Sequence, residues 1–186
     1  MGRKGHNRVY IATSLDGYIA DADGGVGFLD TFPMPEHDDM GFAEFMGRTE
    51  AILMGRKSFE TVLGFGVAWP YAKPVYVWTQ TLQEIPESLS DKVTLVSGET
   101  IEVLERIHKE GYFELYIDGG LTIQSFLKHD LIDEITITTI PVLMGGGIPL
   151  FGPLKGMLTF GCVKSKSYGN GLSQNVYVRS RSDGLS

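Results

Sequence analysis

Apolar positions along the chain fall into short runs separated by polar, glycine-containing turns. Runs that are continuous or alternate with polar residues predict strands, and six such runs are Arg8–Thr13, Ala51–Met54, Pro74–Trp78, Val93–Val96, Phe113–Ile117 and Glu134–Ile140. Apolar residues at helical spacing predict helices, over Glu36–Arg48, Lys57–Leu63, Ile101–Ile107 and Leu121–Lys128. Two further strands are predicted in the tail, around Leu158–Val163 and Asn175–Val178, joined by the turn Tyr168–Gly171.

This order of elements predicts an α/β fold. The first strands alternate with helices or long connections, which is typical of a mostly parallel sheet, and the last two read as an antiparallel hairpin at one edge. The count is about eight strands and four helices. A chain of 186 residues suits one domain, and without an internal repeat or linker we expect residues 1–186 to form one.

Charge and cysteine content narrow the setting. The formal net charge is −7, so a broad nucleic-acid surface is not expected, although a compact anion site needs only two or three cations. No apolar run approaches the roughly 20 residues that span a bilayer, so we expect no membrane partner. Cys162 is the single cysteine, and the start of the chain lacks the apolar core of a signal peptide. A reducing, cytoplasmic setting is therefore expected.

The junction after the second strand concentrates candidate chemistry. Gly55-Arg56-Lys57-Ser58 lies where a strand feeds a helix, so free backbone N–H groups and the positive end of the helix dipole meet there. Such a position binds anions, Gly55 allows close approach, and a guanidinium suits a phosphate. The alternative is that both cations are solvated and Gly55 only makes a turn.

A second glycine junction, Gly119-Gly120, again separates a strand from a helix. It is either a tight turn or a place where a ligand lies against the backbone at the carboxyl edge of the sheet. Two such junctions favour one extended ligand with several phosphates. The glycine-rich run Met144–Gly152 is interpreted as a flexible loop, because Pro149 follows the glycines and no helical pattern succeeds it.

Four segments carry a family resemblance, in the order Ile11–Ala20, Met54–Glu60, Tyr116–Gly120 and Pro141–Phe151. They resemble the dihydrofolate reductase-like superfamily, and most closely its branch related to the reductase domain of riboflavin-pathway deaminase-reductases (the RibD C-terminal branch). The resemblance covers about Arg8 to Val178. It implies an eight-stranded, mostly parallel sheet flanked by helices, NADPH as hydride donor and a homodimer.

The resemblance also implies a function. The chain is expected to be an NADPH-dependent reductase of a small heterocyclic substrate, resembling 5-amino-6-(5-phosphoribosylamino)uracil reductase of riboflavin biosynthesis. Dihydrofolate reductase and a non-catalytic NADP-binding module of the same fold are the alternatives. The chain departs from the riboflavin enzymes, because its 186 residues and single cysteine leave no room for their zinc deaminase. Polar groups for a ribose phosphate are not identifiable either, so another pteridine-like or heterocyclic substrate stays open.

Cofactor-binding residues are likewise implied by the resemblance. Arg56 is expected to contact the 2′-phosphate, within the phosphate-binding segment Gly55, Arg56, Lys57 and Ser58. The remaining positions are Trp78, Thr79, Gln80, Ser97 and Gly98 around the adenosine, Gly119, Gly120, Leu121 and Thr122 under the pyrophosphate, and Ala12, Thr13 and Ile19 around the nicotinamide. Relatives join the diglycine by a cis peptide.

Reduction also needs a proton source. True dihydrofolate reductases place an acid early in the first helix, where this chain has Glu36-His37-Asp38-Asp39. Asp39 matches the family spacing to Gly55, whereas Asp38 lies nearer the helical face, and both can instead be ordinary helix-start acids. Asp16 is the third candidate. His37 lacks a second histidine one helical turn on, so no metal site is expected.

Overall fold

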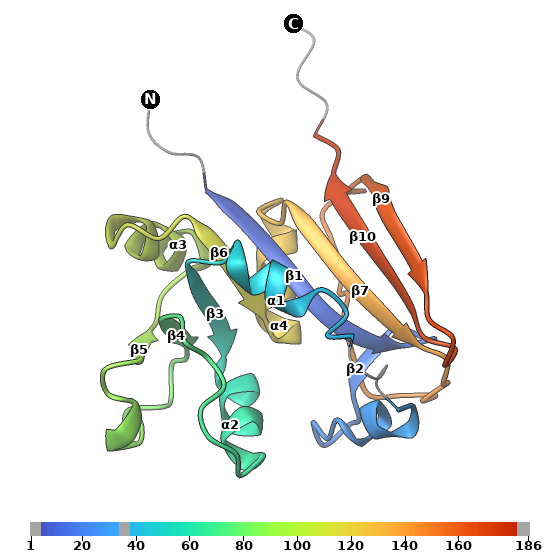
Figure 1. Ribbon diagram of the computed structural model, residues 1–186. Helices are drawn as coiled ribbons and strands as arrows, with labels where there is room; N and C mark the ends of the chain where they lie inside the picture. Colours follow the sequence, from blue (N-terminus) through green and yellow to red (C-terminus); the bar gives the residue numbers. More distant parts are fainter. Residues whose placement is uncertain (1–4, 34–37, 182–186) are drawn as a thin grey trace, which may run out of the picture.

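The computed structural model describes residues 5–33 and 38–181 and is built on one large sheet (Figure 1). Its eight strands run in the order β5-β4-β3-β6-β1-β7-β10-β9. Their bounds are β1 His6–Ser14, β3 Ala51–Gly55, β4 Val75–Trp78, β5 Val93–Val96, β6 Glu114–Asp118, β7 Glu134–Ile140, β9 Phe160–Ser167 and β10 Ser173–Arg179. The first six strands of that order pair in parallel, and β10 is antiparallel to β7 and β9. The predicted α/β class and C-terminal hairpin are confirmed.

Helices cover both faces of this sheet, and side-chain alternation along the strands explains why. On β3, Leu53 faces the cluster packed by α3 (Thr100–Lys109) and α4 (Gly120–Lys128), whereas Ile52 faces the cluster packed by α1 (Phe42–Gly47) and α2 (Arg56–Gly64). Successive strand residues point to opposite faces, so a strand buried on both faces is continuously apolar. The structure is therefore a three-layer sandwich. No helix of the described residues is long and apolar enough to cross a membrane.

Two short strands escaped the sequence prediction. β2 (Tyr18–Ala20) pairs antiparallel with β8 (Ile148–Pro149) in a separate two-stranded sheet. The glycine-rich run interpreted as a flexible loop therefore contains a strand. A strand of two or three residues is too short to show an alternation of apolar and polar positions. Since β2 and β8 also lie more than a hundred residues apart, only the folded chain reveals their pairing. Two 3₁₀ helices, η1 (Gly27–Thr31) and η2 (Glu87–Leu89), were also unpredicted.

The first helix is shorter than predicted. The prediction Glu36–Arg48 reduces to α1, and its first two residues lie outside the described part of the chain. Met40 and Gly41 have φ angles of 59° and 84°, in the left-handed region that a continuing α-helix excludes. Asp38 and Asp39 consequently sit in a turn before the helix. The last hairpin also differs, since β9 begins at Phe160 instead of Leu158.

β9 forms one edge of the main sheet and is exposed along nearly its whole length. Edge strands can pair with another chain. The homodimer nevertheless stays a prediction.

Candidate functional site

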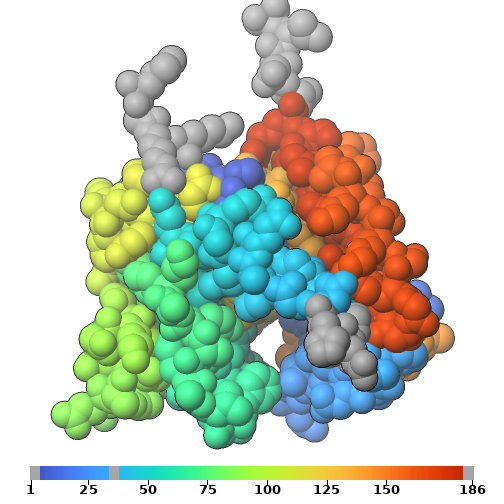
Figure 2. All heavy atoms as spheres, in the orientation of Figure 1, coloured from blue at the N-terminus to red at the C-terminus, as the bar shows by residue number. Residues whose placement is uncertain are grey.

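A cavity of about 1120 Å³ opens at the carboxyl ends of the parallel strands. Its walls come from β1 and β2, the end of β6, the helices α2 and α4, and the segment that follows β4. Figure 2 shows the surface hollowed between the segment of α2 and the blue segment that contains η1. The carboxyl ends of parallel strands meet on this side of the sheet, and open α/β sheets bind their ligands there.

Two helix N-termini adjoin one another in the cavity wall. Gly55 caps α2 and Gly119 caps α4, neither with a side-chain hydrogen bond. A Cβ added at Gly119 would lie 2.5 Å from Ser58 Oγ and 3.6 Å from the Gly55 nitrogen, and Gly119 has φ +87°. Only glycine therefore suits this position. Free N–H groups of two helices converge on one spot, which is an anion-binding arrangement.

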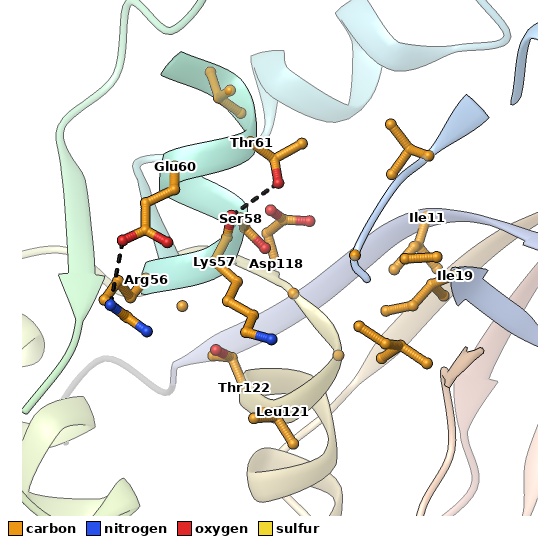
Figure 3. Close-up of a pocket in the computed structure, with 18 of the residues that line it drawn as sticks. Ile11, Ile19, Arg56, Lys57, Ser58, Glu60, Thr61, Asp118, Leu121 and Thr122 are labelled. Carbon is orange, nitrogen blue, oxygen red and sulfur yellow. Dashed lines mark hydrogen bonds and ion pairs between the residues drawn. The ribbon is translucent and has the colours of Figure 1, made fainter. Parts of the chain in front are cut away.

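Two cations stand in the first turn of α2 (Figure 3). Arg56 pairs with Glu60 across 3.4 Å, and both side chains are over 40% exposed. An exposed pair one helical turn apart contributes only about 0.3–0.5 kcal/mol, so a phosphate can displace it. Lys57 has no carboxylate partner within the described ranges, and its side chain reaches into the cavity. Both cations are therefore available to a ligand.

Asp118, the last residue of β6, lies in the cavity wall beside Ser58 (Figure 3). Its Oδ1 accepts a hydrogen bond from the Tyr116 hydroxyl at 3.2 Å. Desolvation raises the pKa of Asp118 from 3.8, although hydrogen bonds from Tyr116, Ser58 and the Gly119 N–H oppose the shift. A carboxyl with a raised pKa inside a cleft is a candidate acid. Sequence reasoning gave Asp118 no role, although an acid that ends a buried strand beside a diglycine was a usable signal.

The wall opposite α2 is largely apolar. It is formed by β1, β2 and the segment up to Leu29. Its aromatic residue, Tyr10, donates to the Met40 carbonyl at 2.9 Å and accepts from Gln174 Nε2 at 3.1 Å. Burial raises the pKa of Tyr10 to about 12. The single proton of the Tyr116 hydroxyl is shared between the Tyr10 carbonyl at 2.9 Å and Asp118 Oδ1 at 3.2 Å. Burial raises the pKa of Tyr116 well above 10, so both hydroxyls are neutral at physiological pH.

Most residues assigned to the cofactor by resemblance line this one cavity. They are Ala12, Ile19, Gly55, Arg56, Lys57, Ser58, Trp78, Thr79, Gln80, Gly119, Gly120, Leu121 and Thr122. Thr13, Ser97 and Gly98 are absent from the lining. Thr13 is buried, and the Gly98 carbonyl accepts from Trp78 Nε1 at 3.1 Å, so Gly98 orients a residue that does line the cavity. The described residues contain no cis peptide bond, so Gly119-Gly120 lacks the cis peptide that the resemblance implied.

The three candidate acids from the sequence lie outside the cavity lining. Asp39 accepts from the N–H groups of Gly41 and Ala43 at 2.9 and 2.7 Å, in the turn before α1. Asp38 accepts from Lys166 Nζ at 2.6 Å, and this hydrogen bond lowers its pKa. The helix-start interpretation accounts for the Asp39 contacts, and a catalytic role for either acid stays a prediction. His37 lies outside the described residues.

Asp16 ties two loops together. It accepts from Ser14 Oγ at 2.6 Å and from the N–H groups of Met144 and Gly145 at 3.1 and 2.8 Å. These bonds hold the pKa of Asp16 at about 2, the Ser14 hydroxyl being the largest cause. An acid held ionised in this way suits loop anchoring better than proton donation. No group of metal ligands occurs among the described residues.

Comparisons with known proteins agree with this architecture. Residues 8–173 match the family described as the RibD C-terminal domain. The uncharacterized protein YwjB of Bacillus subtilis (strain 168) is 35% identical over 174 residues, covering 92% of this chain and 96% of YwjB. A Shewanella sp. PV-4 protein named for riboflavin biosynthesis is 48% identical, with a TM-score of 0.89 over 95% of this chain and 99% of that one.

A more distant structure matches in fold alone. The pyrimidine reductase-like protein of Corynebacterium diphtheriae is 16% identical, with a TM-score of 0.71 over 95% of this chain and 92% of that one. Sheet order, helix placement and the family match thus agree with the resemblance carried by the four sequence segments. The chain belongs to the RibD C-terminal domain family, within the dihydrofolate reductase-like fold.

Proposed function

We propose that this protein is an NADPH-dependent reductase of a small heterocyclic substrate, resembling 5-amino-6-(5-phosphoribosylamino)uracil reductase. The observation that carries the proposal is the pair of helix N-termini with Arg56 and Lys57 in one cavity. That arrangement matches a ligand with several phosphates. A neighbouring apolar wall and a protonatable carboxyl, Asp118, suit the reacting end of the same site.

The residues present fit the cofactor. Backbone N–H groups at the starts of α2 and α4 would hold the pyrophosphate, and Arg56 would hold the 2′-phosphate in place of Glu60. Ala12 and Ile19 would cover the nicotinamide and keep water from it. When bound, NADPH supplies the hydride.

Asp118 is the proposed proton donor. Its raised pKa keeps the carboxyl protonated further above pH 3.8 than an exposed aspartate, and hydrogen bonds to Tyr116 and Ser58 fix its orientation. A positioned acid of this kind contributes about 10²–10⁴-fold in rate. Asp39, Asp38 and Asp16 are the competing assignments from the sequence.

Cofactor binding and turnover test the proposal separately. Trp78 lines the cavity, so titration with NADPH should change tryptophan fluorescence. Loss of NADPH absorbance is then followed with pterins, dihydrofolate, pyrimidinones and quinones. Binding together with oxidation by one heterocycle is the expected result. Binding without turnover by any compound would favour the non-catalytic module, and absence of NADPH binding would overturn the proposal.

A further inference from the structure

The charges of the cavity are divided between its two walls. Arg56 and Lys57 are the cations among the described lining residues, and both belong to the first turn of α2. Figure 3 shows Arg56 on the side away from Ile11 and Ile19. The β1–β2 wall, defined as the lining residues of β1, β2 and the segment up to Leu29, includes Asp23 and no lysine or arginine.

The remaining acidic groups add to this asymmetry. Asp118 lies in the cavity wall, as does Glu60 beside Arg56. A phosphate against the β1–β2 wall would lose water without gaining a cation or a free helix N-terminus. With the cofactor bound, the two cations and both helix starts would already be committed to its phosphates.

The same wall suits an uncharged ring. Ile11, Ile19 and Leu29 offer carbon surface, which favours a flat, apolar-faced group. Asp118 adds a polar anchor beside this surface, and in its protonated form a carboxyl donates one hydrogen bond and accepts another. A lactam or amidine edge of a nitrogen heterocycle presents the matching acceptor and donor side by side.

We infer that the substrate is a neutral, unphosphorylated nitrogen heterocycle, seated between the β1–β2 wall and Asp118. The inference rests on the proposed function, since it takes the α2 end of the cavity as the cofactor's. It separates this chain from an enzyme acting on a phosphoribosyl pyrimidine, whose phosphate would need its own cation.

The test uses the full chain saturated with NADPH, so that the cofactor's phosphate sites are filled. Ribose 5-phosphate serves as the probe for a second phosphate site, and lumazine, pterin and uracil as probes for the ring site, all by calorimetric titration. At least one ring compound should bind with a Kd at least tenfold below that of ribose 5-phosphate. Tighter binding of ribose 5-phosphate than of all three rings would overturn the inference, as would failure of all three to bind.

A charge-adding variant sharpens the test. Val26→Arg places a guanidinium on the β1–β2 wall at a half-exposed position and should improve binding of ribose 5-phosphate at least tenfold. Val163→Arg, on the exposed strand β9, carries the same charge change away from the cavity and should leave binding unchanged. Equal binding by the two variants would count against the inference. Failure of NADPH itself to bind would instead refute the proposed function.

Discussion

At the amino edge of the main sheet, Arg8 and Arg179 lie 2.7 Å from carboxylate oxygens of Glu114 and Asp130. At the carboxyl edge, Arg56 stands 3.4 Å from Glu60. The side chains of Arg8 and Arg179 are at most 10% exposed, whereas that of Arg56 is 43% exposed. At the amino ends of the strands, largely buried arginines therefore form ion pairs that hold the fold together. At the carboxyl ends, Arg56 stays exposed and can bind a ligand.

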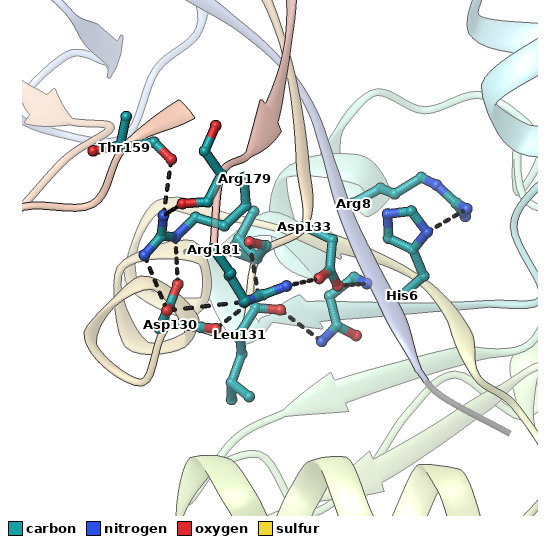
Figure 4. Close-up of polar contacts among 11 residues, drawn as sticks. His6, Arg8, Asp130, Leu131, Asp133, Thr159, Arg179 and Arg181 are labelled. Atoms are coloured by element: carbon teal, nitrogen blue, oxygen red, sulfur yellow. Dashed lines mark hydrogen bonds and ion pairs between the residues drawn. The ribbon is translucent and has the colours of Figure 1, made fainter. Parts of the chain in front are cut away.

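The arginines at the amino edge also have more hydrogen-bond acceptors around them than Arg56 has (Figure 4). Arg179 donates to both oxygens of Asp130 and to the Thr159 carbonyl, while Arg181 pairs with Asp133. These contacts join the end of β10 to the connection between α4 and β7. A guanidinium with most of its donors directed at protein groups has little left for a ligand. The acids near an arginine are therefore as informative about its function as the arginine itself.

The largest effect is expected at Asp118, at the carboxyl edge. Asp118→Asn keeps the shape and removes the proton, so turnover should fall by about 100-fold or more, with NADPH affinity nearly unchanged. Asp39→Asn and Asp38→Asn are the matched controls, measured by steady-state NADPH oxidation with the best substrate of the panel. A larger loss in either control would move the acid role to that residue.

The pH profile adds a second readout on the same variant. Because the protonated carboxyl is the active form, the wild-type rate should fall as pH rises through the raised pKa of Asp118. Whatever rate remains in Asp118→Asn should lack this limb.

The next effect concerns the cofactor. A charge-assisted contact is worth about 1.5–3 kcal/mol, so Arg56 should give a preference for NADPH over NADH of on the order of tenfold to a hundredfold. Arg56→Ala should remove most of it and barely change NADH binding, while Lys57→Ala should cause a smaller, less selective loss. Fluorescence titration with both cofactors measures this. Glu60→Gln should tighten NADPH binding, because it removes the competing carboxylate.

Equal affinities of the unmutated protein for the two cofactors would defeat this account of Arg56. Added salt should narrow the preference, since the contact is partly exposed.

The smallest effect is on stability at the amino edge. Arg179→Ala removes several hydrogen bonds to Asp130 and Thr159, but Asp130 is 39% exposed, so solvent screening limits the loss to about 1–2 kcal/mol. Arg56→Ala should change the free energy of unfolding by less than about 0.5 kcal/mol. Urea unfolding of both variants measures the contrast, and similar losses would break the comparison between the two edges.

Much of the fold could be predicted because its signals are local. β7 matched its predicted bounds, Glu134–Ile140, since seven residues of alternation specify a strand by themselves. The helices α2, α3 and α4 each differ from prediction by no more than two residues at an end. Glycine before a helix start likewise marked both strand-to-helix junctions, at Gly55 and Gly119, because backbone geometry there depends on the residue itself.

Other features depend on contacts between distant parts of the chain. The environment of Asp118 requires Tyr116 and Ser58 from two elements, and no local pattern reports a raised pKa. The ion pair of Asp38 with Lys166 joins residues 128 positions apart, so the sequence around Asp38 does not reveal it. Phe42 and Phe45 do lie on one helix, but the left-handed backbone at Met40 and Gly41 prevents that helix from extending back to Asp38 and Asp39.

The sheet topology also bears on protein engineering. β1 enters and β10 leaves the main sheet on the same side, because β10 runs antiparallel to β7, and Figure 1 shows the start of β1 and the end of β10 on that side. The cavity lies at the other ends of these strands. A purification tag, a surface tether or a second catalytic module could be joined before His6 or after Arg181 without crossing the ligand entrance.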